Sequence, residues 1–206
     1  MDHHFPLPDP PPPPPGSEPE TEPLAEATSS KKPLVGALVV LAGIVAVVAA
    51  VGTWIAAPGR CDGTTFTSSR FAYCLTTPAG WQSGESNQGG FVYDTFSQAD
   101  GSASVMVAAD SLPQGGNLDA LVTQIRSEME TQGLVLDEMT ELSVDGVRGV
   151  QWDAQLEDPQ GNTVTFRTVV VSQAGTFWYV RLQDSPEQFA GHASEFRAML
   201  QSWRFI

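Results

Sequence analysis

The chain has 206 residues and a formal net charge of −14, with ten lysines and arginines against 24 aspartates and glutamates. This charge repels phosphate backbones and therefore argues against a nucleic-acid-binding protein. Ten of the sixteen prolines lie in the first thirty residues, whereas most aromatic residues follow residue 65. The composition therefore predicts one folded domain, confined to residues 58–206.

Residues 1–32 have the composition of a disordered tail. Residues 10–15 are six consecutive prolines, and the first thirty residues contain six acids and no lysine or arginine. Few side chains in this stretch can be buried, and proline removes backbone hydrogen-bond donors. We expect a disordered, acidic, proline-rich tail that serves either as a stiff spacer or as a docking motif for an aromatic groove.

Residues 33–57 form a run of 25 residues without a charge. A helix of that length spans about 37 Å, which exceeds the roughly 30 Å thickness of the hydrocarbon core. We therefore expect one permanent transmembrane helix. A cleaved signal peptide has a shorter apolar region, and a lipoprotein reading would place charged Arg60 beside the acylated Cys61, so both alternatives fit less well.

The charges that flank this segment predict its orientation. Lys31 and Lys32 are the only lysines and precede the segment, whereas only Arg60 follows it closely. Positive residues favour the cytoplasmic side, so we expect a single-pass cell-membrane protein with a cytoplasmic N-terminus and an extracytoplasmic C-terminal domain. Small residues on one face of the helix either permit a transmembrane-helix dimer or face lipid; they are Ala42, Ala46 and Ala50.

Cys61 and Cys74 are the only two cysteines, and the expected topology places both outside the cytoplasm. Thiols in an oxidising compartment tend to pair. Closing a loop of this size stabilises a fold by about 3 kcal/mol in the chain-entropy model. We expect a structural disulfide that ties the start of the domain to a strand near Phe71, with two free buried thiols as the alternative.

The first half of the domain reads as three strands and a helix. Period-two alternation predicts strands over residues 71–75, 91–97 and 104–109, and a polar, glycine-rich stretch predicts a loop over residues 81–90. Asn117 is a typical helix cap, and Gly133 is a typical helix end. The apolar residues between them recur at helical spacing: Leu118, Leu121, Val122, Ile125 and Met129.

The second half reads as four strands and a closing helix. Turn signals such as Asp145-Gly146 separate four consecutive segments, which predicts an antiparallel meander over residues 134–144, 147–157, 163–172 and 176–182. Ser185 and Pro186 are expected to cap and open a last helix, with an apolar stripe of Phe189, Ala193, Phe196, Leu200 and Trp203. Together the elements predict an α+β domain with helices covering an antiparallel sheet.

Two short signatures resemble PsbP-like domains. Residues 71–75 followed by Pro78-Ala79-Gly80-Trp81 are similar to the opening of that family, and residues 178–180 with the closing residues 201–205 are similar to its end. The resemblance spans roughly residues 62–206. It implies an antiparallel sheet between helices, an α/β/α sandwich, that generally serves binding or scaffolding and not catalysis. The expected membrane anchor departs from the soluble namesake, so we expect a membrane-anchored bacterial envelope version. It does not imply the photosynthetic role of the namesake.

The sequence offers little that would support catalysis. His192 is the single histidine of the domain, no G-x-S-x-G motif occurs, and a zinc site would have too few ligands. Acidic residues between positions 137 and 145 are expected to form a solvated edge; they are Asp137, Glu138, Glu141 and Asp145. We therefore expect no catalytic residue, no metal site and no cofactor.

Trp81 opens the predicted polar loop and is therefore the candidate contact residue for a ligand or partner among the tryptophans, although packing in the core is the favoured role. The leading hypothesis is a membrane-anchored extracytoplasmic binding or scaffolding module of the bacterial cell envelope, with an unidentified envelope component or protein as partner. Two alternatives are an envelope hydrolase that uses surface carboxylates and a transmembrane sensor that signals through the proline-rich tail.

Overall fold

The computed structural model of the protein describes residues 60–158 and 160–206. The expected tail with Lys31 and Lys32, and the expected transmembrane segment 33–57, lie outside the described residues. Within the described part, no helix is long and apolar enough to cross a membrane. The membrane anchor, its orientation and the helix dimer therefore stay predictions.

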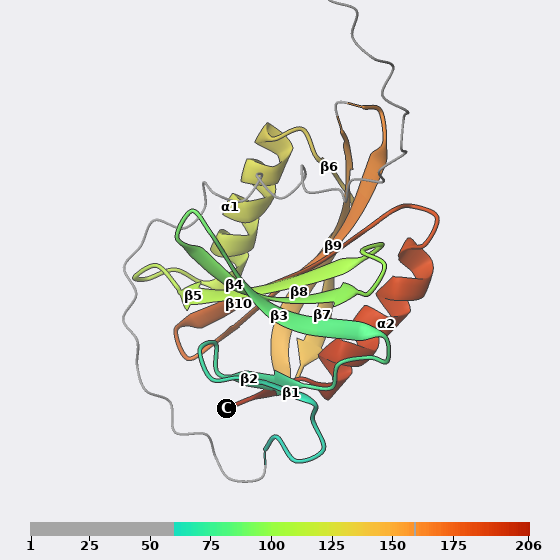
Figure 1. The fold of residues 1–206 in the computed structure, drawn as a ribbon. Coiled ribbons are helices and arrows are strands. Elements are labelled where there is room, and N and C mark those ends of the chain that lie inside the picture. Colours follow the sequence, from blue (N-terminus) through green and yellow to red (C-terminus); the bar gives the residue numbers. More distant parts are fainter. Residues whose placement is uncertain (1–59, 159) are drawn as a thin grey trace, which may run out of the picture. The chain divides into compact units, whose positions relative to one another are not determined.

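The centre of the domain is an eight-stranded sheet in which every pairing is antiparallel (Figure 1). Its order is β3 (Trp81–Gln88), β4 (Phe91–Gln98), β5 (Ser104–Ser111), β10 (Thr176–Asp184), β9 (Thr163–Gln173), β8 (Val147–Glu157) and β6 (Val135–Leu136), with β7 (Thr140–Val144) also paired to β8. The predicted meander is confirmed, because β7, β8, β9 and β10 pair in chain order.

A second, three-stranded sheet joins the two ends of the domain. It contains β1 (Phe66–Ser68), β2 (Tyr73–Leu75) and β11 (Arg204–Phe205), with β2 in the middle. The pairing of β11 with β2 sets Arg204 opposite Cys74 and Phe205 opposite Tyr73. The last residues of the domain are therefore hydrogen-bonded beside its first ones.

The first helix, α1 (Leu118–Thr131), begins and ends where the sequence predicts. The Asn117 side chain accepts a hydrogen bond from the Ala120 amide, which satisfies one free donor of the first turn. At the other end Gly133 has a φ of +88°, and the amides of Gly133 and Leu134 donate to the carbonyls of Glu130 and Met129. This is the Schellman arrangement that a glycine at this position favours.

The second helix, α2 (Phe189–Ser202), begins later than predicted. The expected Ser185 side-chain cap is wrong, because no side chain caps this helix. Instead the Ser185 carbonyl accepts from the Phe189 amide, and the Asp184 carboxylate accepts from the Ser185 amide. Asp184 precedes the predicted cap by one residue and ends β10. The capping motif did not include it, because its side chain is held by contacts with the Ser185 amide and with His192.

The two helices cover opposite faces of the large sheet, which confirms the predicted α/β/α layering (Figure 1). All five predicted apolar residues of α1 are buried against one face, together with Trp152, Phe166 and Tyr179. The other face packs against α2 and the small sheet; its core contains Phe96, Phe196, Leu200, Trp178 and Trp203. Tyr73 stacks on Trp203 in this core, with ring centroids 4.0 Å apart.

Besides the start of α2, two predicted elements differ from the structure. The expected loop at residues 81–90 is β3 and its turn, since the strand pairs over its whole length with β4, from Trp81 opposite Gln98 to Gln88 opposite Phe91. The expected single strand 134–144 is divided into β6 and β7, which both pair with β8. In both cases the neighbouring strand decides the outcome, and serine, glycine and asparagine in β3 gave no periodic signal.

Candidate functional site

Cys61 and Cys74 form the predicted disulfide. The bond ties the first described residues to β2, the central strand of the small sheet. Beside it, the Arg60 guanidinium donates to the Phe205 carbonyl at 2.9 Å, which connects the start of the domain to β11. The chain is thus held at its entry into the domain by one covalent and one long-range polar contact.

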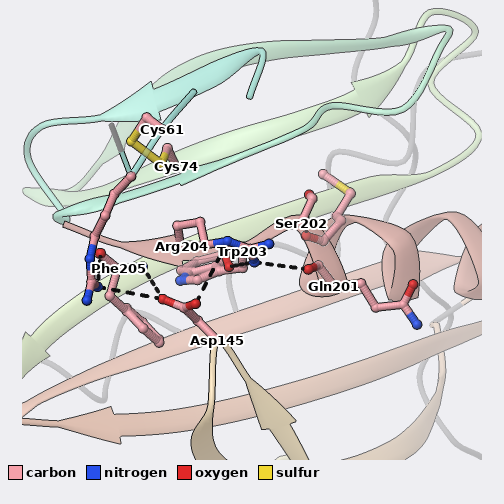
Figure 2. A network of polar contacts seen from close by, with 10 residues as sticks. Cys61, Cys74, Asp145, Gln201, Ser202, Trp203, Arg204 and Phe205 are labelled. Atoms are coloured by element: carbon pink, nitrogen blue, oxygen red, sulfur yellow. Dashed lines mark hydrogen bonds and ion pairs between the residues drawn. A yellow bond between two sulfur atoms is a disulfide. The ribbon is translucent and has the colours of Figure 1, made fainter. Parts of the chain in front are cut away.

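Asp145 joins the same region to the β7–β8 hairpin (Figure 2). Asp145 and Gly146 have φ values of +49° and +79°, the conformation that a two-residue type I′ turn requires. The Asp145 carboxylate accepts from the Phe205 amide at 3.1 Å and lies 3.9 Å from both Arg60 and Arg204. We call the set Arg60, Cys61, Cys74, Asp145, Arg204 and Phe205 the entry clasp.

The clasp corrects part of the predicted acidic edge. Asp137, Glu138 and Glu141 are exposed as expected. Asp145 is half-buried and serves three partners from both ends of the domain. The sequence indicated the turn, because Asp-Gly is a local signal, but the direction of the carboxylate depends on residues about sixty positions away.

Trp81 is buried, with 7 % of its surface exposed. Its indole N–H donates to the Glu195 carboxylate of α2 at 2.6 Å, and Gln98 donates to the same oxygen at 3.3 Å. The ring therefore packs between β3, β4 and α2, which is the core-packing role considered from the sequence. In this position the ring offers little surface for direct contact with a partner.

His192 is paired with a carboxylate that sequence reasoning did not find. Its Nδ1 lies 2.7 Å from Asp184 Oδ2, and the Asp184 side chain has no exposed surface. The ring also meets Trp81 edge-to-face at 5.8 Å. An Asp–His pair is part of a nucleophilic triad, but among the described residues no hydroxyl or thiol is hydrogen-bonded to the second ring nitrogen.

A second buried carboxyl lies under the small sheet. The Tyr73 hydroxyl donates to Asp94 Oδ2 at 2.8 Å, and Asp94 is 1 % exposed. Burial raises the pKa of the Asp94 carboxyl above its ordinary value, although hydrogen bonds from Ser68 and Tyr73 act in the opposite direction. Burial, followed by the nearby Asp94 charge, also raises the pKa of Tyr73. This pair is enclosed in the core and is a structural feature.

A surface cleft of about 340 Å³ lies between α2 and the β7–β9 part of the large sheet. Its apolar lining is Leu142, Ala193, Phe196 and Leu200; its polar lining is Ser143, Gln151, Arg167, Arg197 and Gln201. The volume is at the lower end of the range of small-molecule sites, about 300–1,000 Å³. We call these nine residues the α2 cleft.

The two arginines of the α2 cleft have different surroundings. Arg167 is fixed by two hydrogen bonds of 2.7 Å to Asp153, and these bonds raise the pKa of its guanidinium. Arg197 is exposed, and no carboxylate among the described residues lies within ion-pair distance of it. The cleft therefore combines a preorganised cation, a cation available for contact and an apolar floor.

The cleft has no group that transfers protons near neutral pH. Arginine stays protonated, amides and hydrocarbons do not titrate, and a serine nucleophile needs a neighbouring base. None of the nine lining residues is a histidine, a carboxylic acid, a cysteine or a lysine. The arrangement can bind and orient a molecule, but its lining gives no means of acid–base catalysis.

Of the residues predicted as sites, Cys61 and Cys74 are brought together as a disulfide. Trp81 lies apart from the α2 cleft and is hydrogen-bonded to Glu195 of α2. In the described part of the chain, no group of three or more histidine, cysteine or acidic residues could hold a metal ion. Sequence reasoning missed the α2 cleft. Its one signal in the sequence is the polar alternation of Gln151, Asp153 and Gln155 in β8, because Gln151 lines the cleft and Asp153 holds its Arg167.

No protein-family model matches the sequence, and comparison with curated protein sequences gives no match. Solved structures do match. The chain is similar to the cyanobacterial PsbP protein CyanoP of Synechocystis, with 14 % identity and a TM-score of 0.51, over 68 % of this chain and 91 % of that one.

Two further solved structures have lower scores. LpqN of Mycobacterium tuberculosis, described as involved in cell envelope biogenesis, is 17 % identical with a TM-score of 0.43, over 64 % of this chain and 81 % of that one. The Ran-binding protein Mog1p of Saccharomyces cerevisiae is 13 % identical with a TM-score of 0.42, over 65 % and 90 %. The similarity to CyanoP shows a PsbP-like fold, as the sequence signatures indicated; at 14 % identity it shows nothing about activity.

Proposed function

We propose that the protein is a non-catalytic binding module, held at the outer side of a bacterial cell membrane, whose α2 cleft receives the ligand or partner. The observation that carries the proposal is the lining of the cleft, which has an apolar floor and two guanidinium groups but no proton-transfer group. Such a lining favours recognition over chemistry, because binding needs complementary surface and catalysis needs groups that act in the transition state.

The entry clasp supports the tethered part of the proposal. The expected membrane helix ends at Ala57, only three residues before Arg60 in the sequence. The clasp then fixes Arg60 and Cys61 to β2, β11 and the β7–β8 hairpin. Such fixation of the first described residues supports the proposal, because a tethered scaffolding or binding module needs a defined connection to its anchor.

Site-specific photo-crosslinking of the full chain in its native envelope tests this function. A photoreactive residue replaces Gln201, an exposed residue of the α2 cleft; the matched control replaces Gln124, an exposed residue of α1 on the opposite sheet face. We expect one discrete adduct from position 201, absent from position 124. The adduct should disappear when Ser143→Phe fills the cleft, since Ser143 is itself exposed and its replacement leaves the core intact.

Equal adduct patterns from positions 201 and 124 would contradict the proposal, because they would show that the cleft has no preferred partner. The non-catalytic part has a separate test. If the purified full chain degrades an envelope polymer, and one carboxylate-to-amide substitution abolishes that activity, then the hydrolase alternative is correct and this account is wrong.

A further inference from the structure

We propose that the ligand of the α2 cleft is an anionic amphiphile: a phosphate or carboxylate head group on a hydrocarbon chain, taken from the adjacent membrane. This inference rests on the proposed function, since it names the ligand class of the same site. It depends on three features of the described residues, namely the charge of the cleft, its apolar floor and its position beside the entry clasp.

The first feature is a local excess of positive charge in an acidic domain. Residues 58–206 contain eighteen acids and eight arginines. Four of those arginines belong to the cleft or the clasp: Arg60, Arg167, Arg197 and Arg204. Their acidic partners are only two, Asp145 and Asp153. Two further acids are adjacent in sequence to the cleft lining. Glu141 pairs with Arg148, which also pairs with Asp119, and the Glu195 carboxylate accepts hydrogen bonds from Trp81 and Gln98.

The guanidinium groups are placed to hold an anion. Asp153 occupies Nε and Nη2 of Arg167, which leaves Nη1 for another acceptor. Arg197 stands on the helix that forms the other wall of the cleft. Charge-assisted hydrogen bonds from arginine are short and strong, and the planar guanidinium suits the oxygens of phosphate and carboxylate.

The second feature is the apolar floor of the cleft, which lies beside the two guanidinium groups. Leu142, which is partly exposed, and Leu200, which is 6 % exposed, contribute hydrocarbon surface to the same cleft, above the buried Phe196. A small inorganic anion would leave that surface in water, and a purely apolar molecule would leave Arg197 without a partner. A molecule with both parts satisfies both walls, because apolar burial and ion pairing then act on one ligand.

The third feature is location. Ser143 of the cleft is two residues before Asp145 of the clasp, and Gln201 of the cleft is three residues before Arg204. The Arg204 guanidinium also donates to the Gln201 carbonyl. The cleft therefore lies beside the entry clasp, where the chain enters the domain; the expected membrane helix, residues 33–57, precedes that point in the sequence. Membrane lipids and fatty acids are the anionic amphiphiles found at such a place.

Calorimetric titration of the full chain in phosphatidylcholine nanodiscs tests the inference, with empty nanodiscs as blank. Three probes are compared. n-Octyl phosphate carries a charged head group and a hydrocarbon chain, inorganic phosphate carries the charge alone, and 1-octanol carries the chain alone. We expect n-octyl phosphate to bind at least about tenfold more tightly than either of the others, the effect of one charge-assisted contact. Arg197→Gln should weaken its binding by a similar factor.

Arg70→Gln is the matched control, because it removes the same charge from an exposed arginine outside the cleft and the clasp. Affinity within about twofold of wild type is expected for it. The inference is overturned if 1-octanol binds as tightly as n-octyl phosphate, or if the two arginine substitutions have the same effect. When the titration overturns the ligand class, crosslinking from position 201 decides the rest. One discrete adduct means that the binding function stands and only the ligand class is wrong. Loss of the adduct means that the ligand class and the binding function are both wrong.

Discussion

At the scale of single residues, Trp81 shows how a side chain that looks available in the sequence can be structural. Its ring is buried, and its N–H is bonded to Glu195. We predict that Trp81→Phe lowers the free energy of unfolding by about 1–3 kcal/mol, because a hydrogen bond to a carboxylate is lost. Trp81→Ala should lower it by about 3–5 kcal/mol, since a cavity is added.

Chemical denaturation of the two Trp81 variants measures these losses, and crosslinking from position 201 measures binding. A folded Trp81→Phe protein should keep the position-201 adduct. Unchanged stability together with loss of the adduct would instead restore Trp81 as a contact residue.

Asp94 gives a prediction on pH. Burial raises its pKa in the folded state, so the folded protein holds this proton more tightly than the unfolded chain. The resulting stability is present below the unfolded pKa, near 3.9, and is lost as pH rises through the folded pKa. The amide of Asp94→Asn does not ionise in this pH range, so its neutral state is kept at every pH. Its side-chain oxygen still accepts a hydrogen bond from Tyr73.

The stability of the Asp94→Asn protein relative to wild type should therefore increase from about pH 4 to about pH 7. Denaturant midpoints of the two proteins across that range measure the difference, in which the titration of all other groups cancels. A difference that is constant, or that falls with rising pH, is incompatible with a raised Asp94 pKa.

At the scale of elements, the disulfide and the clasp join the first described residues to the last strand. We predict that the double substitution Cys61→Ser/Cys74→Ser lowers the free energy of unfolding by about 3 kcal/mol, the loop-closure contribution for this spacing. Reductant should lower the stability of the wild-type protein by a similar amount and leave the double variant unchanged. A wild-type protein that is insensitive to reductant, with two thiols detected, would contradict the disulfide.

The elements also show which parts of a fold a sequence can predict. The helix α1 was predicted with its cap, its buried residues and its terminal glycine, because all these signals lie within one turn of the positions they affect. The hairpin turn at Asp145-Gly146 was predicted for the same reason. The PsbP-like signatures at both ends indicated the fold that the comparison with CyanoP shows.

The failures share a different physical origin. The strand β3 has a polar, glycine-rich sequence and forms because β4 provides a partner for each of its residues. The α2 cleft needs α2 to lie over β7, β8 and β9, and the residues that line it extend from Leu142 to Gln201. The Asp184–His192 pair likewise joins two elements. Such features depend on packing over long sequence distances, which neither periodicity nor local motifs encode.

At the scale of the whole molecule, the α2 cleft and the entry clasp together hold four of the eight arginines of an acidic domain, and only two acids, Asp145 and Asp153, pair with them. The clasp residue Asp145 directly follows β7, and the clasp strand β11 directly follows α2. A ligand in the cleft would therefore contact two elements that continue into the clasp. This arrangement supports the proposal that a PsbP-like fold holds an anionic amphiphile, with residues 33–57 as the proposed membrane anchor.

The most direct test is methyl NMR of the full chain in phosphatidylcholine nanodiscs, labelled at alanine, isoleucine, leucine and valine and titrated with n-octyl phosphate. We predict saturable shifts for the methyl groups of the α2 cleft, Leu142, Ala193 and Leu200, while those under α1, Leu121, Val122 and Ile125, stay in place. Shifts centred on the α1 face, or saturable shifts at neither face, would contradict the assignment of the α2 cleft as the binding site.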